Sequence, residues 1–455
     1  MNRTIMVIPP ISDHDKQRHL LFDAQRVIQS GPFSFHSISI LSSLLHLLMA
    51  VRAVISEAMR LSFPATNVVS IDPHLIDDSL LLQHVIPILT GGDIVALPTE
   101  TVYGLAGNAL DYLAVSRIFQ AKGRPSDNPL IVHISNMEQL QRLVAPSALP
   151  QPGSLVQRLC DRFWPGPLTI VFPKHESVPD NVTGGQPHVA IRMPSHPIAR
   201  RIIELSGLPL AAPSANRSGR PSPTCAAHVL EDLGREKELP EGGSESAFVF
   251  GQGTGVGCIV DGGYCDVGVE STVVRAETFE VLRPGTVTLE QLRTIDERFH
   301  LFGAMKHVHK ATEDLTEEEK EAINVPSTPG LKYTHYAPSA PVILFEFTQP
   351  WTSFRHSIVE YVQKRLREEP QLKLALLHVH EDLIYEDLPS SVLVYPIGST
   401  SDPAAIARAL FAAFRDLDGQ SIDEIVMEGV EESNEGLAVM NRARKAARTV
   451  IEPST

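Results

Sequence analysis

The chain has 455 residues, of which 43% are hydrophobic, and its formal net charge at pH 7 is −15. This length is typical of two or three domains, each able to bury its own core. The excess of 54 acidic residues over 39 Lys and Arg residues disfavours broad, charge-driven binding to nucleic acid, which requires clustered cations. A basic cluster inside such an acidic chain is therefore informative.

The four cysteines lack the CxxC spacing of a zinc site and are too few for a disulfide scaffold. We expect four reduced, packed thiols in an intracellular protein. The most apolar run, residues 37–51, is too short to span a membrane and contains His46. We therefore expect a soluble, cytoplasmic protein.

Residues 1–65 are predicted to form an N-terminal extension. From Met49 onward this segment has arginines, serines and only one acidic residue, which is compatible with a mitochondrial targeting segment read from an internal start. A poorly ordered extension or a packing helix is an equally good interpretation. A mitochondrial fraction beside the cytoplasmic one stays open.

Residues 70–299 alternate helix and strand signals, which predicts a mixed α/β domain. We expect, in chain order, a strand at 94–97, a helix that ends at Gly123, a strand at 130–134 and a helix that ends at Gly207. A last helix is predicted to be capped by Thr224 and to end at Gly234. Functional side chains are expected in the loops at the ends of these elements.

Residues 300–341 are predicted to be a linker. They hold an acidic run, most simply a solvated helix, and a proline-rich stretch, "PSTPGLKYTHYAPSAP". A passive linker does not need Lys332, Tyr333, His335 and Tyr336 in so short a space. We expect a tether that also contacts a ligand, and a plain spacer is the alternative.

Residues 342–455 alternate short apolar runs with helical stretches, which predicts a smaller, Rossmann-like α/β domain with a parallel sheet. No glycine-rich phosphate loop opens its helices, so we expect a regulatory or gating role before a catalytic one. Near its end, "AVMNRARKAART" is predicted to be a basic helix whose cations complement the C-terminal dipole.

Isolated cations stand next to Pro or Gly in the first domain: Lys122, Arg124, Arg192 and Arg283. Arg suits forked recognition of carboxylate or phosphate, and Lys supplies a compact charge to a phosphoryl oxygen. The loop "PSANRSGRPSPT" adds hydroxyl and amide groups before a helix N-terminus, an arrangement that suits an anion. Each feature alone is weak, since such an Arg is more often in a surface salt bridge. Together they indicate a cleft for a nucleotide and a small polar acid.

Several other nucleotide and hydrolase motifs are absent. The run "GQGTGVG" fails the GxGxxG spacing and is better interpreted as a flexible loop. The sequence has no GxxxxGK[ST], HExxH or GxSxG pattern either. P-loop nucleotidases, zinc hydrolases and nucleophilic triads therefore have no support.

A set of longer motifs carries a resemblance that runs from about residue 93 to residue 338. In order, they are "PTETVYGLA", "KGRPSDNPLIVHI", "GPLT", "VAIRMPSHP", "PSANRSGRPSPT", "GVESTVV" and "LRPG". In this order they resemble the YrdC-like family. The added "TPGLKYTHYAP" and the second α/β domain resemble its two-domain threonylcarbamoyl-AMP synthase branch. The fold that this implies is a twisted mixed α/β domain with a nucleotide cleft, linked to a smaller parallel-sheet domain.

The resemblance implies a nucleotidyltransferase that uses L-threonine, bicarbonate or CO2, and ATP with Mg²⁺. The products are L-threonylcarbamoyl-AMP and pyrophosphate, and the former is the donor from which a separate transferase complex modifies the tRNA adenosine next to the anticodon. Stable binding of tRNA by this chain is not expected. Nor does the sequence identify magnesium ligands.

The resemblance also implies site residues. Lys122, Arg124, Ser214 and Asn216 are expected around the ATP phosphates and the carbamate, as the catalytic group. Further ATP contacts are expected from Asn128, Ser222, Arg283, Tyr333, His335 and Tyr336, the last three closing over the cleft from the linker. L-Threonine is expected to contact Thr101, His133, Arg192 and the backbone at Ala212.

One of these residues also has a purely structural interpretation, and two other functions are alternatives. From its strand alone, His133 would be a satisfied core histidine, and only the family pattern makes it a substrate contact. A YrdC-like module that binds RNA without synthase activity is the main alternative function, which the acidic net charge disfavours. A carbamoyl-phosphate-handling maturation factor would need CxxC zinc pairs that the chain lacks.

Overall fold

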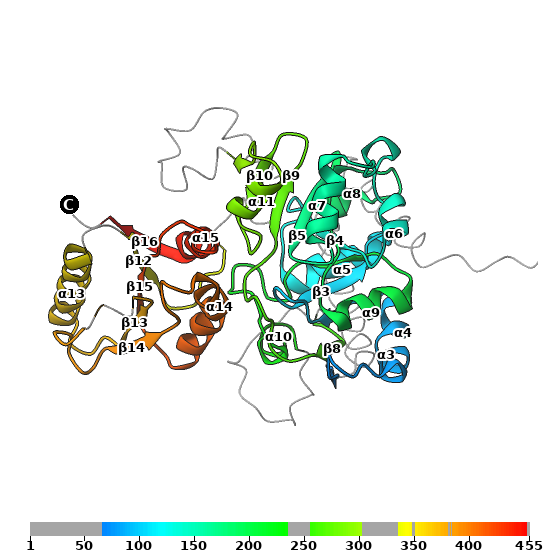
Figure 1. Ribbon diagram of the computed structural model, residues 1–455. Helices are drawn as coiled ribbons and strands as arrows, with labels where there is room; N and C mark the ends of the chain where they lie inside the picture. The colour runs from blue at the N-terminus through cyan, green and yellow to red at the C-terminus, as the bar shows by residue number, and fades with distance from the viewer. Residues whose placement is uncertain are drawn as a thin grey trace, which may run out of the picture. The chain divides into compact units, whose positions relative to one another are not determined.

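The computed structural model describes residues 66–234, 255–302, 335–347, 351–380, 383 and 385–452. The N-terminal extension, Lys332, Tyr333 and most of the predicted linker lie outside these ranges. Residues Pro64–Thr455 form one compact unit. Within it are two sheets, each with its own helices (Figure 1).

The larger sheet has eleven strands in the order β1-β8-β2-β3-β7-β4-β6-β5-β9-β10-β11. Parallel and antiparallel pairs mix in it: β4 pairs parallel with β6, for example, whereas β5 pairs antiparallel with β6. The strands are β1 Asn67–Ser70, β2 Val95–Leu97, β3 Gly104–Asn108, β4 Ile131–His133, β5 Leu168–Pro173, β6 His188–Arg192, β7 Leu210–Ala211, β8 Cys258–Asp261, β9 Thr272–Arg275, β10 Glu280–Arg283 and β11 His300–Leu301.

Helices cover both faces of this sheet because its strands alternate their apolar side chains. Val95 and Leu97 of β2 pack with α3, α4 and α9, whereas Ala96 packs on the opposite face with α5, α7 and α10. The helices are α3 Asp78–His84, α4 Ile86–Thr90, α5 Tyr112–Lys122, α6 Met137–Gln141, α7 Leu155–Phe163, α8 Asp180–Thr183, α9 Pro197–Ser206, α10 Ala226–Leu233 and α11 Leu289–Ile295, with a 3-10 turn at Pro146–Ala148.

The second sheet has five strands in the order β14-β13-β15-β12-β16, and all of its pairs are parallel. Its strands are β12 Val342–Phe345, β13 Leu374–His378, β14 Leu393–Pro396, β15 Glu424–Glu428 and β16 Ala447–Ile451. Helix α13 (Trp351–Glu368) covers one face, and α14 (Pro403–Gly419) with α15 (Gly436–Ala446) covers the other (Figure 1). The predicted mixed domain and parallel-sheet domain are thus confirmed.

The predicted helix ends at Gly123, Gly207 and Gly234 agree with the structure, and one predicted N-cap does not. Gly123 and Gly207 take left-handed backbone conformations at the ends of α5 and α9. The prediction that Thr224 caps α10 is wrong, because the N-cap is Cys225 and makes no side-chain capping bond. The backbone N–H and hydroxyl of Thr224 instead lie within hydrogen-bond distance of Nδ1 of His228.

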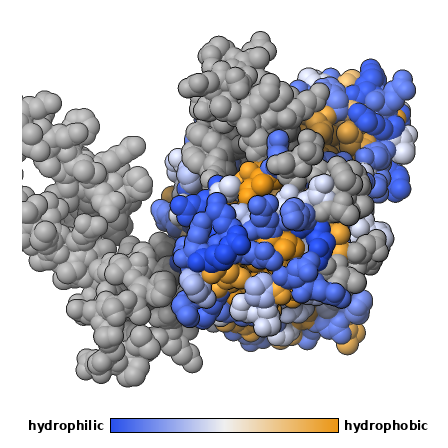
Figure 2. Space-filling model, turned by 90° about the vertical axis from the view of Figure 1, so that its left-hand side faces the viewer, coloured by the Kyte–Doolittle hydropathy of each residue, from blue (hydrophilic) through white to orange (hydrophobic). Residues whose placement is uncertain are grey.

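The four cysteines, Cys160, Cys225, Cys258 and Cys265, are free and buried, as predicted. In the part of the chain that the structure describes, no helix is both long and apolar enough to cross a membrane. The surface visible in Figure 2 is mainly hydrophilic, with apolar side chains in separate patches.

Candidate active site

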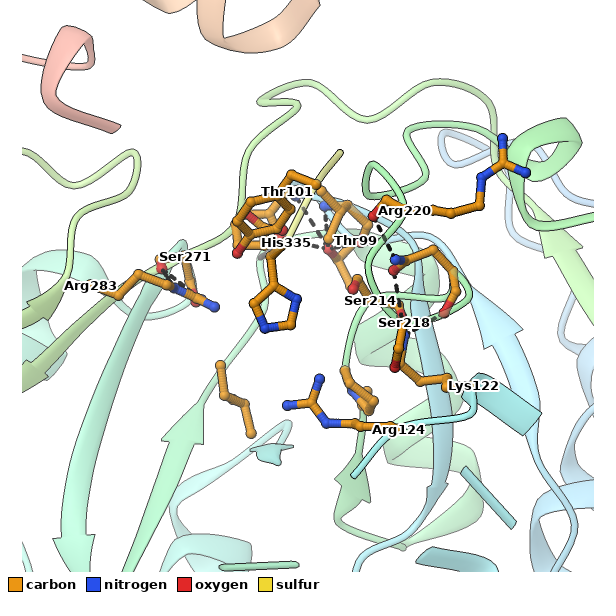
Figure 3. A pocket seen from close by; sticks show the side chains of 18 of the residues that line it. Thr99, Thr101, Lys122, Arg124, Ser214, Ser218, Arg220, Ser271, Arg283 and His335 are labelled. Atoms are coloured by element: carbon orange, nitrogen blue, oxygen red, sulfur yellow. Dashed lines mark hydrogen bonds between the residues drawn. The ribbon is translucent and has the colours of Figure 1, made fainter. Parts of the chain in front are cut away.

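A cavity of about 740 Å³, counting its open mouth, collects side chains from the ends of several strands and from the linker. Eleven of the residues expected at the site line it: Thr101, Lys122, Arg124, His133, Arg192, Ala212, Ser214, Asn216, Arg283, His335 and Tyr336. Figure 3 shows Lys122, Arg124, Ser214, Arg283 and His335 around one space.

Helix α5 places Lys122 and Arg124 on the cavity wall. Asp111 caps the helix start with its carboxylate, and the buried face of the helix runs through Phe119 to Lys122 itself. Gly123 then reverses the chain with φ +60° and ψ +36°, and the N–H of Arg124 donates back to the carbonyl of Phe119. The glycine therefore turns the two cations that flank it toward the same space.

Backbone carbonyls, not carboxylates, hold the ammonium group of Lys122. Its Nζ donates to the carbonyl oxygens of Ser214 and Asn216, the latter at 2.5 Å. Burial, and next the charge of Arg124, lower the pKa of Lys122 well below its usual range. Burial likewise lowers the pKa of Arg124 to about 10. A bound anion would compensate both groups for their lost hydration.

The guanidinium of Arg192 is held in place at the end of β6. It lies 2.5 Å from Oε1 of Glu100, donates to the hydroxyl of Thr101 at 2.8 Å and donates to the carbonyl of Gly166 at 3.2 Å. Burial alone would raise the pKa of Glu100, but the charge and hydrogen bonding of Arg192, together with backbone hydrogen bonds, lower it. Arg192 is therefore charged, buried and fixed in orientation at the cavity wall.

His133 lies on β4, which pairs parallel with β6 at Arg192. Burial, and then the charge of Arg192, lower the pKa of His133 to about 3. The imidazole is neutral at any physiological pH. It can exchange neutral hydrogen bonds with a ligand without adding a charge.

Arg283 forms another wall of the cavity from the end of β10. Its Nε and one terminal nitrogen donate to the carbonyl of Ser271, at 3.2 and 2.9 Å. The following loop passes so close that a Cβ on Gly285 would lie 2.4 Å from the nitrogen of Thr272 and 2.5 Å from the carbonyl oxygen of Glu270. Only glycine fits there, and this close approach keeps Arg283 against the residues that lead into β9.

Three expected site residues are not found on the cavity wall. Asn128 is buried, and its backbone carbonyl accepts a hydrogen bond from Nε of Arg124. Its side chain does not line the cavity. Ser222 is also buried behind the wall, where its hydroxyl donates to Oε1 of Glu270 at 2.5 Å. Tyr333 lies outside the described residues.

The sequence analysis missed Glu270, Ser218 and Arg220, which all line the cavity. Glu270 stood in the quoted motif "GVESTVV" without a role. Ser218 and Arg220 stood in "PSANRSGRPSPT", whose named members were Ser214, Asn216 and Ser222. All three residues could therefore have been proposed as site residues, because they stand in motifs that were already assigned to the site.

Comparisons with known proteins agree over both domains. A family model described as "Telomere recombination", for the Sua5, YciO and YrdC proteins, matches residues 87–285, and the model "Threonylcarbamoyl-AMP synthase, C-terminal domain" matches residues 287–448. The threonylcarbamoyl-AMP synthase of Pyrococcus abyssi is 43% identical over 78% of this chain and 91% of its own length. The chain belongs to the threonylcarbamoyl-AMP synthase family.

Other members of the synthase family match over similar lengths. The protein of that name from Schizosaccharomyces pombe is 40% identical over 79% of this chain and 86% of its own length. The Bacillus subtilis protein is 40% identical over 83% of this chain and 93% of its own length. The crystal structure of P. abyssi Sua5 complexed with L-threonine superposes with a TM-score of 0.70 and 40% identity, over 85% of this chain and 99% of that one.

Proposed function

We propose that the chain is a nucleotidyltransferase that makes L-threonylcarbamoyl-AMP and pyrophosphate from L-threonine, bicarbonate or CO2, and ATP. The observation that carries the proposal is one cavity walled by four cations: Lys122, Arg192 and Arg283, which are buried, and Arg124, which is half-buried. So much buried positive charge needs an anionic ligand. The names of the relatives, and the L-threonine complex of one of them, indicate which ligands to expect.

Arg192 is the residue best placed to bind the carboxylate of L-threonine. Its guanidinium is a planar fork that suits a carboxylate, and Glu100 and Thr101 already fix its orientation. Neutral His133 and the backbone at Ala212 lie on the same cavity wall. The amino group then attacks the carbon of CO2, so that a C–N bond forms, the nitrogen loses a proton and N-carboxy-threonine results.

The second step is attack by the new carboxylate on the α-phosphorus of ATP. An O–P bond forms, the bond to the leaving pyrophosphate breaks, and negative charge grows on the departing oxygens. Lys122, Arg124 and Arg283 supply fixed positive charge for this, and Ser214 and Asn216 add polar groups beside Lys122. Such transfers depend on positioning and charge stabilisation, and no protein nucleophile is needed.

Magnesium is proposed to enter with ATP rather than to occupy a site made by the protein. Among the described residues no cluster of three or more His, Cys, Asp or Glu side chains could hold a metal ion. Glu270, a carboxylate on the cavity wall, already accepts hydrogen bonds from Ser222 and Arg442. Mg²⁺ commonly keeps several waters and binds phosphate oxygens with few protein ligands, which fits this wall.

The product is a reactive mixed anhydride, so a separate transferase complex must consume it, in tRNA modification next to the anticodon. We place this reaction in the cytoplasm, with a mitochondrial fraction depending on the residues before 66. The RNA-binding alternative gains no support from the site, since Lys122, Arg192 and Arg283 are buried in a cavity and Arg124 is half-buried there. RNA phosphates would need exposed cations.

The test is to incubate the purified chain with ATP, Mg²⁺, L-threonine and bicarbonate, and to follow pyrophosphate release and the adenylate adduct by mass spectrometry. The adduct should require every component and should be lost in Lys122→Ala. A folded protein that binds ATP and threonine but makes no adduct with all components present would contradict the proposal.

A further inference from the structure

Glu270 is out of place in a site for a triphosphate. Three buried cations, Lys122, Arg192 and Arg283, line the cavity together with the half-buried Arg124, and Glu270 is the one carboxylate among the described residues that line it. A free carboxylate there would repel the phosphates of ATP. On the basis of the proposed function, we ask which group neutralises the charge of Glu270.

The two carboxylate oxygens of Glu270 have different partners. Oε1 accepts the hydroxyl of Ser222 at 2.5 Å, and Oε2 accepts Nε of Arg442 at 3.0 Å. Arg442 is fully buried, and Glu270 is 7% exposed. Burial alone would raise the pKa of Glu270, but the charges of Arg442 and Arg283 outweigh this and lower it.

Arg442 reaches this position from α15, in the second domain, 172 residues along the chain from Glu270. Its terminal nitrogens donate to the carbonyls of Pro284 and Glu270, and its guanidinium carbon lies 5.9 Å from the ring centre of Tyr336, another cavity residue. The guanidinium thus joins the "GVEST" segment that leads into β9, the "LRPG" turn and the linker.

Apolar packing holds α15 in this place. Val439 and Ala443 of α15 belong to the same buried cluster as Val102 and Val269, which come from the loops around the cavity. The position of Arg442 is therefore fixed by a core shared between the two domains. Arg444 and Lys445 lie in the last turn of α15, as expected of basic residues that complement the helix dipole, whereas Arg442 lies before that turn and pairs with Glu270.

We propose that Arg442 is a positioning residue for ATP: by neutralising Glu270 it removes a repulsive charge from the phosphate site and fixes Ser222 and the Arg283 turn. The second domain thus completes the nucleotide site through this ion pair. Removal of one partner of a buried ion pair leaves an uncompensated charge, whereas removal of both charges does not. This difference makes the proposal testable.

The experiment compares three full-length variants, Arg442→Met, Glu270→Gln with Arg442→Met, and Arg444→Met as control. Arg444 lies on the same helix but pairs with Glu346 and Glu432 inside the second domain. Calorimetry with the β,γ-imido analogue of ATP and, separately, with L-threonine measures affinity without any need for synthesis. Thermal denaturation reports whether each variant is folded.

Arg442→Met should weaken binding of the analogue about ten-fold or more, with little change for threonine, because the unpaired carboxylate repels phosphate. Adding Glu270→Gln should restore most of the affinity, and Arg444→Met should bind as the wild type does. If Arg442→Met does not fold, Arg442→Lys, which keeps the charge but not the fork, should bind the analogue with intermediate affinity.

Equal losses for both ligands, or a double variant no better than Arg442→Met, would overturn the proposal and reduce Arg442 to a structural role. Because the readout is binding, this failure is separate from failure of the proposed reaction. A wild type that binds the analogue but makes no adduct would contradict the reaction and leave the Arg442 result valid. A wild type that binds no analogue would overturn both.

Discussion

Arg192 is the buried cation of the cavity whose surroundings most clearly match a single ligand group. Three partners, Glu100, Thr101 and Gly166, fix its guanidinium, so little freedom is lost when a carboxylate binds. Arg192→Lys keeps the charge but loses the fork. It should raise the KM for L-threonine about ten-fold or more while the KM for ATP stays the same. A parallel rise in both constants would assign Arg192 to the nucleotide instead.

His133 predicts a pH dependence of stability. Its pKa is about 3 in the folded chain, against about 6.5 for an exposed histidine. Between these values the unfolded chain binds a proton that the folded chain does not, so stability falls as pH falls below about 6.5. From pH 6.5 to 5 the His133 contribution is about 2 kcal/mol.

The measurement is urea denaturation of the wild type and of His133→Asn across this pH range. The variant should lose less stability on acidification than the wild type, whatever its stability at neutral pH. Identical slopes would mean that His133 titrates normally in the folded chain, and that it is not buried as described.

At the residue scale, short motifs predicted individual site residues, whereas contacts between residues far apart in the chain could not be predicted. Lys122, Arg124, Arg192 and Arg283 were identified because each stands in a short motif beside Pro or Gly. The Glu270–Arg442 pair could not be predicted, since nothing in either local sequence links positions 172 apart. Asn128 and Ser222, expected to touch ATP, lie behind the wall because whole motifs fold into the site while only some of their side chains face it.

The turn after β10 holds the cavity wall together at the element scale. A Cβ on Gly285 would collide with the backbone of Glu270, Ser271 and Thr272, and backbone cannot move aside as a flexible side chain can. Gly285→Ala should lower stability by about 1–3 kcal/mol and should weaken ATP binding, since the Arg283 contacts to Ser271 would shift. Thermal denaturation and nucleotide calorimetry measure the two effects.

Gly419→Ala is the matched control, because a Cβ there meets nothing within 4 Å and its φ is not positive. That variant should be neutral or slightly stabilised. If Gly285→Ala behaves in the same way, the close approach of this turn to the β9 strand does not constrain the site.

Sequence patterns were most accurate for elements with a strong local cause. Gly123 and Gly207 end their helices as predicted because a left-handed residue strongly favours glycine. The cap of α10 was misplaced by one residue, since Thr is only preferred at an N-cap and here contacts His228 instead. The strand order of the eleven-stranded sheet could not be predicted from the sequence, because pairing between strands far apart in the chain determines it.

Close packing between the two domains is a property of the whole molecule. A Cβ on Gly268, at φ +80°, would lie 2.4 Å from the carbonyl oxygen of Arg408 on α14, and Nε of Arg408 donates to the carbonyl of Asp266. Gly268→Ala should therefore loosen the second domain. It should weaken ATP binding, as Arg442→Met does.

Gly263→Ala provides the control, because its φ of +84° is equally unfavourable for alanine but a Cβ there meets nothing within 4 Å. Both variants carry the backbone strain, so the difference between them measures the contact with Arg408. If the two variants bind ATP equally well, the packing of the second domain does not support the nucleotide site.

The most direct test of the proposed reaction is the mass of the adenylate formed from ¹³C-bicarbonate, ATP, Mg²⁺ and unlabelled L-threonine. We expect an adduct that carries threonine, AMP and one carbon from bicarbonate, so its mass must increase with the label. An adduct of threonine and AMP without the labelled carbon would show that the site activates the carboxylate of threonine itself. That result would contradict the proposed synthesis of L-threonylcarbamoyl-AMP.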